Sequence, residues 1–420
     1  MMRWMLAIGL AVLGTVVSIA AAGDWPQYRG PEHDGITAEK IATNWRQHPP
    51  RVIWSIPLGS SLGSISSGGG KLYAFVKQDA DEAAVALDPA TGKQLWTTVV
   101  DKTIIDKDGG DGPRSTPAFN DGKIYVLGTY QKLACLNAAD GSVIWKHDLN
   151  DEFGGKEPAW GSAASPLVDG DRVFACCGGE KQSLLAFDKN SGKVVWKGTS
   201  EKPTHAAPIP ATIAGVRQII FYTQYGLVSV EPATGKELWK QKFQFNVSSA
   251  ASPVMCGDDL VYVSAGYGSG SGAYQISLAD GKWTSTEIWR RHGNKALNHW
   301  STPIYKDGYI YGLYGFKQFK TEPLKCIEAR TGKEIWSQDG FGQGQVIMAG
   351  GVLLATTDFG DLVLVQPTPD GYHEIARTHP FQGEPKCWTD PTVANGHIYA
   401  RSQTGAVCLD VNLMTTGRAE

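Results

Sequence analysis

The chain has 420 residues, of which 42% are hydrophobic and 19% are charged, so it can bury a large core and does not belong to the disordered class. Its 39 basic and 42 acidic residues give a formal net charge of −3. This balance disfavours a nucleic-acid partner, because no basic surplus exists to neutralise phosphates. Fifty glycines and 14 tryptophans indicate many tight turns and recurring large packing residues, as in an all-β repeat protein.

Residues 1–22 have the features of a secretory signal peptide. Arg3 precedes an uncharged apolar run that ends in three alanines, Ala20 to Ala22, and this arrangement predicts cleavage after Ala22. An uncleaved anchor is the alternative. No cysteine lies near the predicted cleavage site, so we expect an exported, soluble chain without a lipid anchor, in which residues 23–50 form an N-terminal extension.

An eleven-residue phrase recurs along the chain. Residues Ala86 to Trp96 read Ala-Leu-Asp-Pro-Ala-Thr-Gly-Lys-Gln-Leu-Trp. Four gapless copies place Gly six residues and Trp ten residues after a small first residue, and they begin at Cys135, Ala186, Ser229 and Cys326. Weaker copies begin at Ser277, Leu364 and Cys408, and the turn glycines lie 39 to 51 residues apart. Such a period indicates a repeat architecture.

A second recurring phrase precedes each copy, as in Ser165-Pro166 and the eight residues that follow. It is typical of a strand, a tight turn and a second strand. Together the two phrases predict four antiparallel strands per unit, and eight units predict an eight-bladed β-propeller over residues 51–412, with a tail at 413–420. The last unit lacks its fourth strand, while Val52 to Leu58 is an unmatched tryptophan strand. We therefore expect the strand of Trp54 to pair with that of Cys408 and complete the last blade.

Seven cysteines are present, so they cannot all form intramolecular bridges. Cys135, Cys326 and Cys408 occupy the first position of the repeat, where other copies have Ala or Ser. This pattern predicts buried structural thiols.

The phrase at 86–96 resembles the tryptophan-docking motif of the PQQ-like, or quinoprotein-type, β-propellers, and the resemblance spans about residues 52–410. The segment from Asp24 to Pro31 is similar to the leader of exported bacterial members. The resemblance implies an eight-bladed propeller in the bacterial periplasm. Family members include PQQ-dependent dehydrogenases and the non-enzymatic assembly factor BamB, which this chain resembles in length and repeat layout.

In the dehydrogenases the resemblance implies PQQ stacked on a tryptophan over the channel, a calcium ion, an aspartate base and in several cases a disulfide between adjacent cysteines. Cys176 and Cys177 are adjacent here. They lie at the end of a predicted strand, where neighbouring side chains face opposite ways, so a bridge would be strained. Two separate thiols are the alternative.

The residues just before the innermost strands should converge at one mouth of the channel. We predict a binding rim formed by Arg114, Trp160, His205, Asn246, His299, Trp300, Gln343, Gln345, Trp388 and Asp390. Aromatic groups beside polar ones suit a pocket. The alternatives are that the tryptophans plug the channel, that the histidines are hydrogen-bonded structural residues, and that Asp390 is a turn residue before Pro391 rather than a base or metal ligand.

The metal-binding signal is weak. Asp106, Asp108 and Asp111 share a glycine-rich loop that lacks the downstream glutamate of a calcium-binding EF-hand. No convincing calcium set lies at the rim, where Asn246 and Asp390 are isolated candidates. The sequence therefore favours an exported, monomeric, non-catalytic binding propeller without a cofactor, presenting its rim to a protein, peptide or envelope component. The alternative is a PQQ- and calcium-dependent dehydrogenase of alcohols or sugars, with Asp390 as a catalytic residue.

Overall fold

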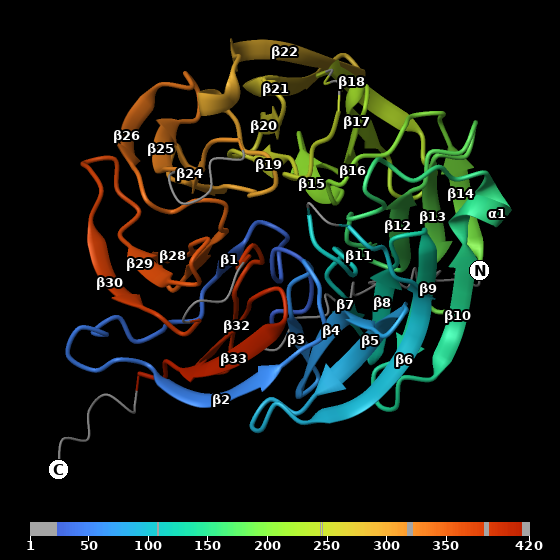
Figure 1. Ribbon diagram of the computed structural model, residues 1–420. Coiled ribbons are helices and arrows are strands. Elements are labelled where there is room, and N and C mark those ends of the chain that lie inside the picture. Colours follow the sequence, from blue (N-terminus) through green and yellow to red (C-terminus); the bar gives the residue numbers. More distant parts are fainter. Residues whose placement is uncertain are drawn as a thin grey trace, which may run out of the picture.

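The computed structural model describes residues 23–106, 109–243, 245, 247–316, 322–381 and 386–413. Its strands form eight sheets arranged in a ring (Figure 1). Each sheet has four antiparallel strands, and one gains a fifth. The prediction of an all-β, eight-bladed propeller is confirmed.

The first four blades follow in chain order, each from its innermost to its outermost strand. They are β3 (Ser66–Gly68), β4 (Lys71–Gln78), β5 (Asp81–Leu87) and β6 (Gln94–Lys102); β7 (Ala118–Asn120), β8 (Lys123–Leu127), β9 (Lys132–Asn137) and β10 (Val143–Asp148); β11 (Leu167–Asp169), β12 (Arg172–Cys176), β13 (Leu184–Asp188) and β14 (Val194–Gly198); and β15 (Ile209–Ile213), β16 (Val216–Thr223), β17 (Gly226–Val230) and β18 (Glu237–Lys242).

The next three blades have the same order. They are β19 (Val254–Met255), β20 (Leu260–Ala265), β21 (Gly270–Ala279) and β22 (Lys282–Arg291); β23 (Ile304–Lys306), β24 (Tyr309–Leu313), β25 (Leu324–Glu328) and β26 (Glu334–Gln338); and β27 (Val346–Ala349), β28 (Val352–Thr356), β29 (Leu362–Val365) and β30 (Glu374–Thr378). Two short helices lie in connections, α1 (Leu149–Phe153) and the 3₁₀ helix η1 (Asn294–Ala296).

The eighth blade is completed from both ends of the described chain. It consists of β31 (Thr392–Ala394), β32 (His397–Arg401), β33 (Gly405–Asp410) and, as its outermost strand, β2 (Arg51–Pro57). Strands β2 and β33 are antiparallel, with Trp54 opposite Cys408. This pairing confirms the predicted closure, which covers an edge that β33 would otherwise expose.

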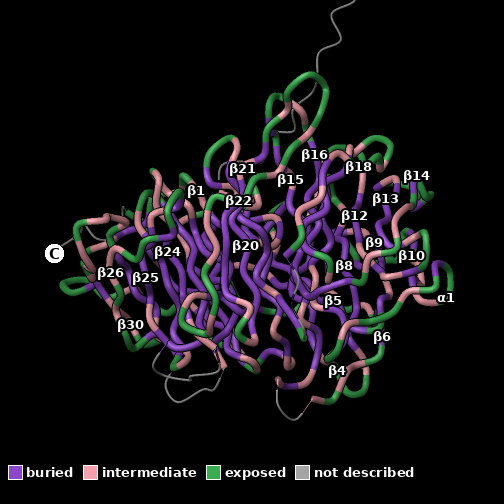
Figure 2. The backbone as a smooth tube through the Cα atoms, turned by 90° about the horizontal axis from the view of Figure 1, so that it is seen from above, coloured by how far each residue is buried: buried purple, intermediate pink, exposed green. Residues whose placement is uncertain are grey.

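The core is divided into clusters between neighbouring blades. In one cluster Tyr73 and Phe75 of the first blade pack against Ile124 and Val126 of the second. Central strands are covered on both faces and are therefore apolar throughout much of their length. Figure 2 shows buried residues inside the blades and exposed residues mainly in loops and outer strands.

The repeated glycine and tryptophan are explained by one contact between successive blades. Gly141 has a φ of +77°, and a Cβ at this position would lie 2.6 Å from Trp96 of the preceding blade. The Trp96 indole donates a hydrogen bond to the carbonyl of Ala138 at 3.1 Å. Because only glycine combines this backbone conformation with this close approach, the spacing of Gly and Trp is fixed by the packing of one blade on the next.

All seven cysteines lie in the described part of the chain, and none of them forms a disulfide there. Cys135, Cys326 and Cys408 are fully buried, as a slot for a small side chain requires. Cys176 and Cys177 are separate: the Cys176 Sγ lies 3.5 Å from the Ser183 hydroxyl, and the Cys177 thiol is directed at the carbonyl of Gln182 at 3.3 Å.

The N-terminal extension enters the central channel, which sequence reasoning did not predict. Its strand β1 (Ile36–Thr37) pairs in parallel with β27 and lies within the ring (Figure 1). The carbonyls of Trp25 and Pro26 accept hydrogen bonds from the backbone of Ser67 and Phe119 in the first two blades. The predicted signal peptide, residues 1–22, lies outside the described residues. Within those that are described, no helix has the length and apolar character needed to cross a membrane.

Candidate binding pocket at the channel mouth

A cavity of about 760 Å³ occupies one mouth of the channel, a volume within the usual range of ligand pockets. Most of the predicted rim residues line it: Arg114, Trp160, His205, His299, Trp300, Gln345, Trp388 and Asp390. Gln343 is not among the lining residues, and Asn246 lies outside the described part of the chain. The structure adds lining residues that sequence reasoning missed, including Tyr28, Ser64, Tyr267 and Lys386.

One wall of the cavity is aromatic. The rings of Trp300 and Trp388 stack with centroids 5.2 Å apart and an interplanar angle of 28°. Gln345 lies between the two blades that carry them, and its amide nitrogen donates to the carbonyls of Trp300 and Trp388 at 3.3 and 2.9 Å. His299 packs against Trp300 with centroids 4.6 Å apart. These contacts fix the wall in place, and the cavity lies beside the tryptophans rather than being filled by them.

Trp160 lies across the ring in the third blade and is 39% exposed. The carbonyl of Ala159, which precedes it, lies 2.8 Å from the His205 Nε2, while the His205 Nδ1 lies 2.6 Å from the hydroxyl of Ser248. Burial lowers the pKa of His205 to about 4, so the imidazole is neutral at neutral pH. His205 therefore has the geometry of a hydrogen-bonded structural residue.

The basic wall is formed by Arg114 and Lys386. Arg114 makes an ion pair with Asp106 at 2.8 Å and donates to the carbonyl of Gly112 at 2.9 Å, while burial lowers its pKa. Lys386 donates to the carbonyl of Gly109 at 3.1 Å, and its ammonium lies 5.4 Å from the ring of Trp388.

The two described acidic residues of the glycine-rich loop, Asp106 and Asp111, pair with different cations. Asp106 pairs with Arg114. Asp111 pairs with Lys77 at 2.7 Å, and this hydrogen bond holds the pKa of Asp111 below its usual value. Asp108 lies outside the described residues. In the described chain each of these two carboxylates thus has its own cation.

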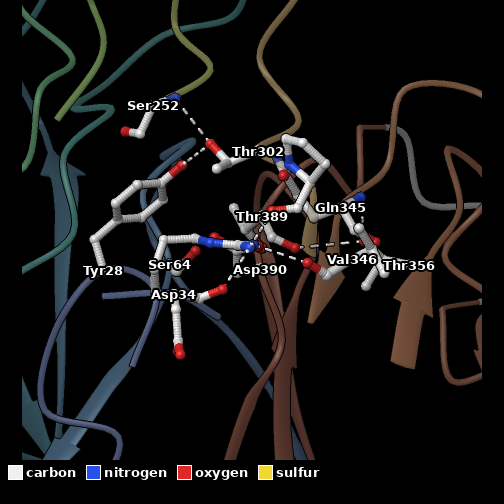
Figure 3. Close-up of polar contacts among 12 residues, drawn as sticks. Tyr28, Asp34, Ser64, Ser252, Thr302, Gln345, Val346, Thr356, Thr389 and Asp390 are labelled. Carbon is white, nitrogen blue, oxygen red and sulfur yellow. Dashed lines mark hydrogen bonds and ion pairs between the residues drawn. The ribbon is translucent and has the colours of Figure 1, made fainter. Parts of the chain in front are cut away.

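The floor of the cavity is formed by the N-terminal extension. Arg29 and Asp390 form an ion pair at 3.2 Å, and both side chains are 1% exposed. The Arg29 guanidinium also donates to the carbonyls of Val346, Pro303 and Asp34 at 2.8, 3.0 and 3.2 Å. Figure 3 shows Asp390, Val346 and Asp34 around this group.

Asp390 is therefore neither an exposed turn residue nor a free base. Burial raises its pKa, and the neighbouring Arg29 acts in the opposite direction. Tyr28, the residue before Arg29, places its hydroxyl 3.0 Å from that of Thr302. Figure 3 shows these two side chains pointing toward one another. Tyr28 and Asp390 line the cavity, whereas Arg29 does not and is connected to it through Asp390. We refer to these three residues as the floor of the cavity.

The protein-family model described as outer membrane protein assembly factor BamB matches residues 80–311 and 320–418. The chain belongs to this family. The BamB of Shewanella oneidensis is 24% identical over 309 residues, which cover 69% of this chain and 70% of that protein. The structure of BamB from Moraxella catarrhalis superposes with a TM-score of 0.59 at 17% identity, covering 86% of this chain and 97% of that one, and shows the fold alone.

Quinoproteins are also similar to this BamB-family chain. The quinoprotein ethanol dehydrogenase of Pseudomonas aeruginosa is 30% identical over 148 residues, which cover 31% of this chain and 23% of that enzyme. A Pseudomonas polyvinylalcohol dehydrogenase and the tetrathionate hydrolase of Acidithiobacillus ferrooxidans also match. In each of these three relatives the matched segment covers less than half of the relative's length, at most 48%.

The cavity of this BamB-family propeller does not fit a calcium-activated quinone. Calcium takes six to eight oxygen ligands, yet the two acids that line the cavity among the described residues, Asp106 and Asp390, are each paired with an arginine. Nowhere in the described chain do three or more His, Cys, Asp or Glu residues gather in a way that could hold a metal ion. The stacked tryptophans could support a planar ring, but the described part of the cavity wall offers an incomplete donor set for its cation.

Proposed function

We propose that this BamB-family propeller is an exported, non-catalytic binding protein of the bacterial envelope, and that its channel-mouth pocket receives a projecting segment of a protein or peptide partner. The observation that carries the proposal is a cavity with an aromatic wall, in which the acids that the structure describes, Asp106 and Asp390, are already paired with arginines. Trp, Tyr and Arg are the residue types that dominate binding hot spots, and Trp160, Trp300, Trp388, Tyr267 and Arg114 all line the cavity.

The electrostatics support binding more than acid–base chemistry. Asp390 is held by Arg29, and Asp106 is held by Arg114. A general base must reach the proton that it removes, but the Asp390 side chain is 1% exposed. A partner would therefore meet aromatic faces and fixed hydrogen-bonding groups.

An envelope location is supported by two features. The matching family is described as an outer membrane protein assembly factor, and residues 1–22 have the pattern of a secretory signal. A monomer presenting one mouth of the ring is the arrangement that we propose.

A PQQ-dependent dehydrogenase is the second candidate. It is favoured by the quinoprotein relatives and by the stacked pair of Trp300 and Trp388, on which a planar cofactor could lie. It requires a cation at the quinone oxygen, and the paired carboxylates of the cavity do not supply the ligands.

A crosslinking experiment tests the binding proposal. A photoreactive amino acid replaces Trp160 in cells, and a matched control replaces Tyr225, an aromatic residue that is also 39% exposed but does not line the cavity. We expect a discrete crosslinked partner from position 160 that is lost when Trp300 and Trp388 are both replaced by alanine. Equal crosslinking from both positions would contradict the proposal.

Cofactor addition separates the two candidates. The purified protein is mixed with PQQ and calcium, and its melting temperature and the reduction of an artificial electron acceptor by alcohols or sugars are measured. We expect neither a specific thermal shift nor turnover. Turnover that disappears in Asp390→Ala, measured against a surface control such as Asp280→Ala, would establish the dehydrogenase instead.

A further inference from the structure

The backbone of Trp160 is strained. Its φ is +68°, in the left-handed region that large side chains rarely adopt. Such a conformation costs on the order of 1–3 kcal/mol and persists only where the surroundings hold it. The contacts on either side of Trp160 therefore decide where this exposed indole lies.

The contact that precedes Trp160 comes from His205, which lies 2.8 Å from the carbonyl of Ala159. The contact that follows it comes from the tip of the β8–β9 hairpin in the neighbouring blade. The amide of Ser162 donates to the carbonyl of Thr129 at 2.9 Å. A Cβ on Gly161 would lie 2.2 Å from the methyl group of Thr129, so a movement of Thr129 is passed directly to the turn that carries Trp160.

Thr129 is in turn held by a buried carboxylate of the first blade. Glu82, on β5, is completely buried. One of its oxygens accepts from the Thr129 amide at 2.9 Å, and the other accepts from the Thr129 hydroxyl at 2.5 Å. Beside it, Asp101 of β6 accepts from the amide of Tyr130 at 2.9 Å. Two carboxylates of the first blade thus hold the tip of the β8–β9 hairpin of the second blade through hydrogen bonds.

We propose that Glu82 is a positioning residue for the pocket, and that its protonation state sets, through Thr129, the position of Trp160 and hence the affinity of the pocket. The effect on affinity rests on the proposed binding function, whereas the effect on Trp160 does not. An ionised carboxylate accepts both hydrogen bonds of Thr129. A protonated one accepts from the amide through one oxygen, while its other oxygen carries a proton that the Thr129 hydroxyl must accept, so the direction of that hydrogen bond reverses. Two charge-assisted hydrogen bonds are then replaced by weaker neutral ones, and Thr129 is held less firmly.

The surroundings of Glu82 place this change in the neutral range. Burial raises the pKa of Glu82 to about 7, the hydrogen bonds from Thr129 and the charge of Arg114 act to lower it, and the charge of Asp101 raises it. Lys132 lies beside Asp101, and Asp101 also influences the pKa of Lys146. We therefore expect Trp160 to be held less firmly as the pH falls through about 7.

Fluorine NMR of protein labelled with 5-fluorotryptophan tests this without a ligand. The Trp160 resonance is assigned by its disappearance in Trp160→Phe. We expect it to titrate with a midpoint near pH 7, to lose that titration in Glu82→Gln, and to keep it in Glu374→Gln, a matched change of a carboxylate on the outer strand β30. In Thr129→Val, which removes the hydroxyl, we expect the Trp160 resonance to be displaced at high pH.

A Trp160 resonance that does not move between about pH 5.5 and 8.5, or that titrates unchanged in Glu82→Gln, would overturn the inference even if a partner crosslinks at the pocket. A resonance that titrates as expected in a protein that captures no partner would contradict the proposed function and leave Glu82 as the positioning residue of Trp160.

Discussion

The ion pair at the channel floor gives a quantitative prediction. Arg29→Met keeps most of the apolar length of the side chain but removes the cation from Asp390 and the donors from three carbonyls. Removing one partner of a buried pair costs about 3–5 kcal/mol, because the other charge is left uncompensated. Both side chains are 1% exposed, so water cannot replace the lost contacts and we expect a loss of unfolding free energy in this range.

Replacing the other partner of the ion pair, Asp390, should lower the unfolding free energy less than Arg29→Met does. In Asp390→Asn the guanidinium of Arg29 keeps its three carbonyl acceptors, so we expect a loss of about 1–3 kcal/mol. The double variant should be more stable than the sum of the single losses implies, with a coupling energy of about 1–3 kcal/mol.

Urea unfolding followed by circular dichroism measures these free energies, and an unchanged dependence on urea shows that the folded and unfolded states are comparable. The pH dependence of the stability loss in Arg29→Met gives a second test, because its direction can be predicted. Arg29 lowers the pKa of Asp390, so its removal raises that pKa further. A raised carboxyl pKa lowers stability as the pH rises, so the deficit of Arg29→Met should shrink in acid. Strictly additive losses, or losses below about 1 kcal/mol for both single variants, would refute the assignment of the floor.

Three further predictions concern stability. Burial raises the pKa of Glu82 from 4.5 to about 7, so the unfolding free energy of the parent should fall as the pH rises through this interval. Glu82→Gln lacks this titration. Its unfolding free energy relative to the parent, measured by urea unfolding, should therefore increase by up to about 3 kcal/mol between about pH 4 and 8. Deleting residues 24–58 removes β2 and should abolish cooperative unfolding in calorimetry; a deletion variant that melts like the parent would contradict the closure. In Gly235→Ala the new Cβ would lie 2.5 Å from Trp196. Gly215 has nearly the same φ but open space around it, so Gly215→Ala carries only a backbone cost of about 1 kcal/mol. Gly235→Ala should therefore lower the melting temperature by at least twice as much as Gly215→Ala.

The number of blades and their closure could be predicted from sequence because local geometry fixes the pattern. Gly141 must be glycine to combine its φ with the close approach of Trp96. Because the same contact is needed between other blades, Gly and Trp recur at a fixed spacing from each other in the sequence. The convergence of Trp300 and Trp388 was also predictable, because both residues precede innermost strands and those strands surround one channel.

The floor of the pocket could not be predicted in this way. Arg29 and Asp390 are 361 residues apart in sequence. Asp390 stands at the Ser/Thr position of the second recurring phrase, but Arg29 lies outside the repeats, so the repeat pattern does not reveal that the two residues pair. Tyr267 and Lys386 lie in loops that differ from blade to blade, so their positions follow from tertiary contacts. The hydrogen bonds between Glu82 and Thr129 likewise cross from one blade to the next, so they follow from the tertiary arrangement and not from the local sequence.

The N-terminal segment links the completion of the fold to the formation of the pocket. Its Arg51–Pro57 portion is the outermost strand of the eighth blade, while Tyr28 lines the cavity and Arg29 holds the lining residue Asp390. One stretch of chain therefore completes both structures, and Asp390 receives its counter-charge only when that stretch is in place. Because an uncompensated buried carboxylate is costly, a ring that lacks this segment is destabilised at the floor as well as at the open blade. The aromatic pocket is thus expected to form only in the fully closed propeller.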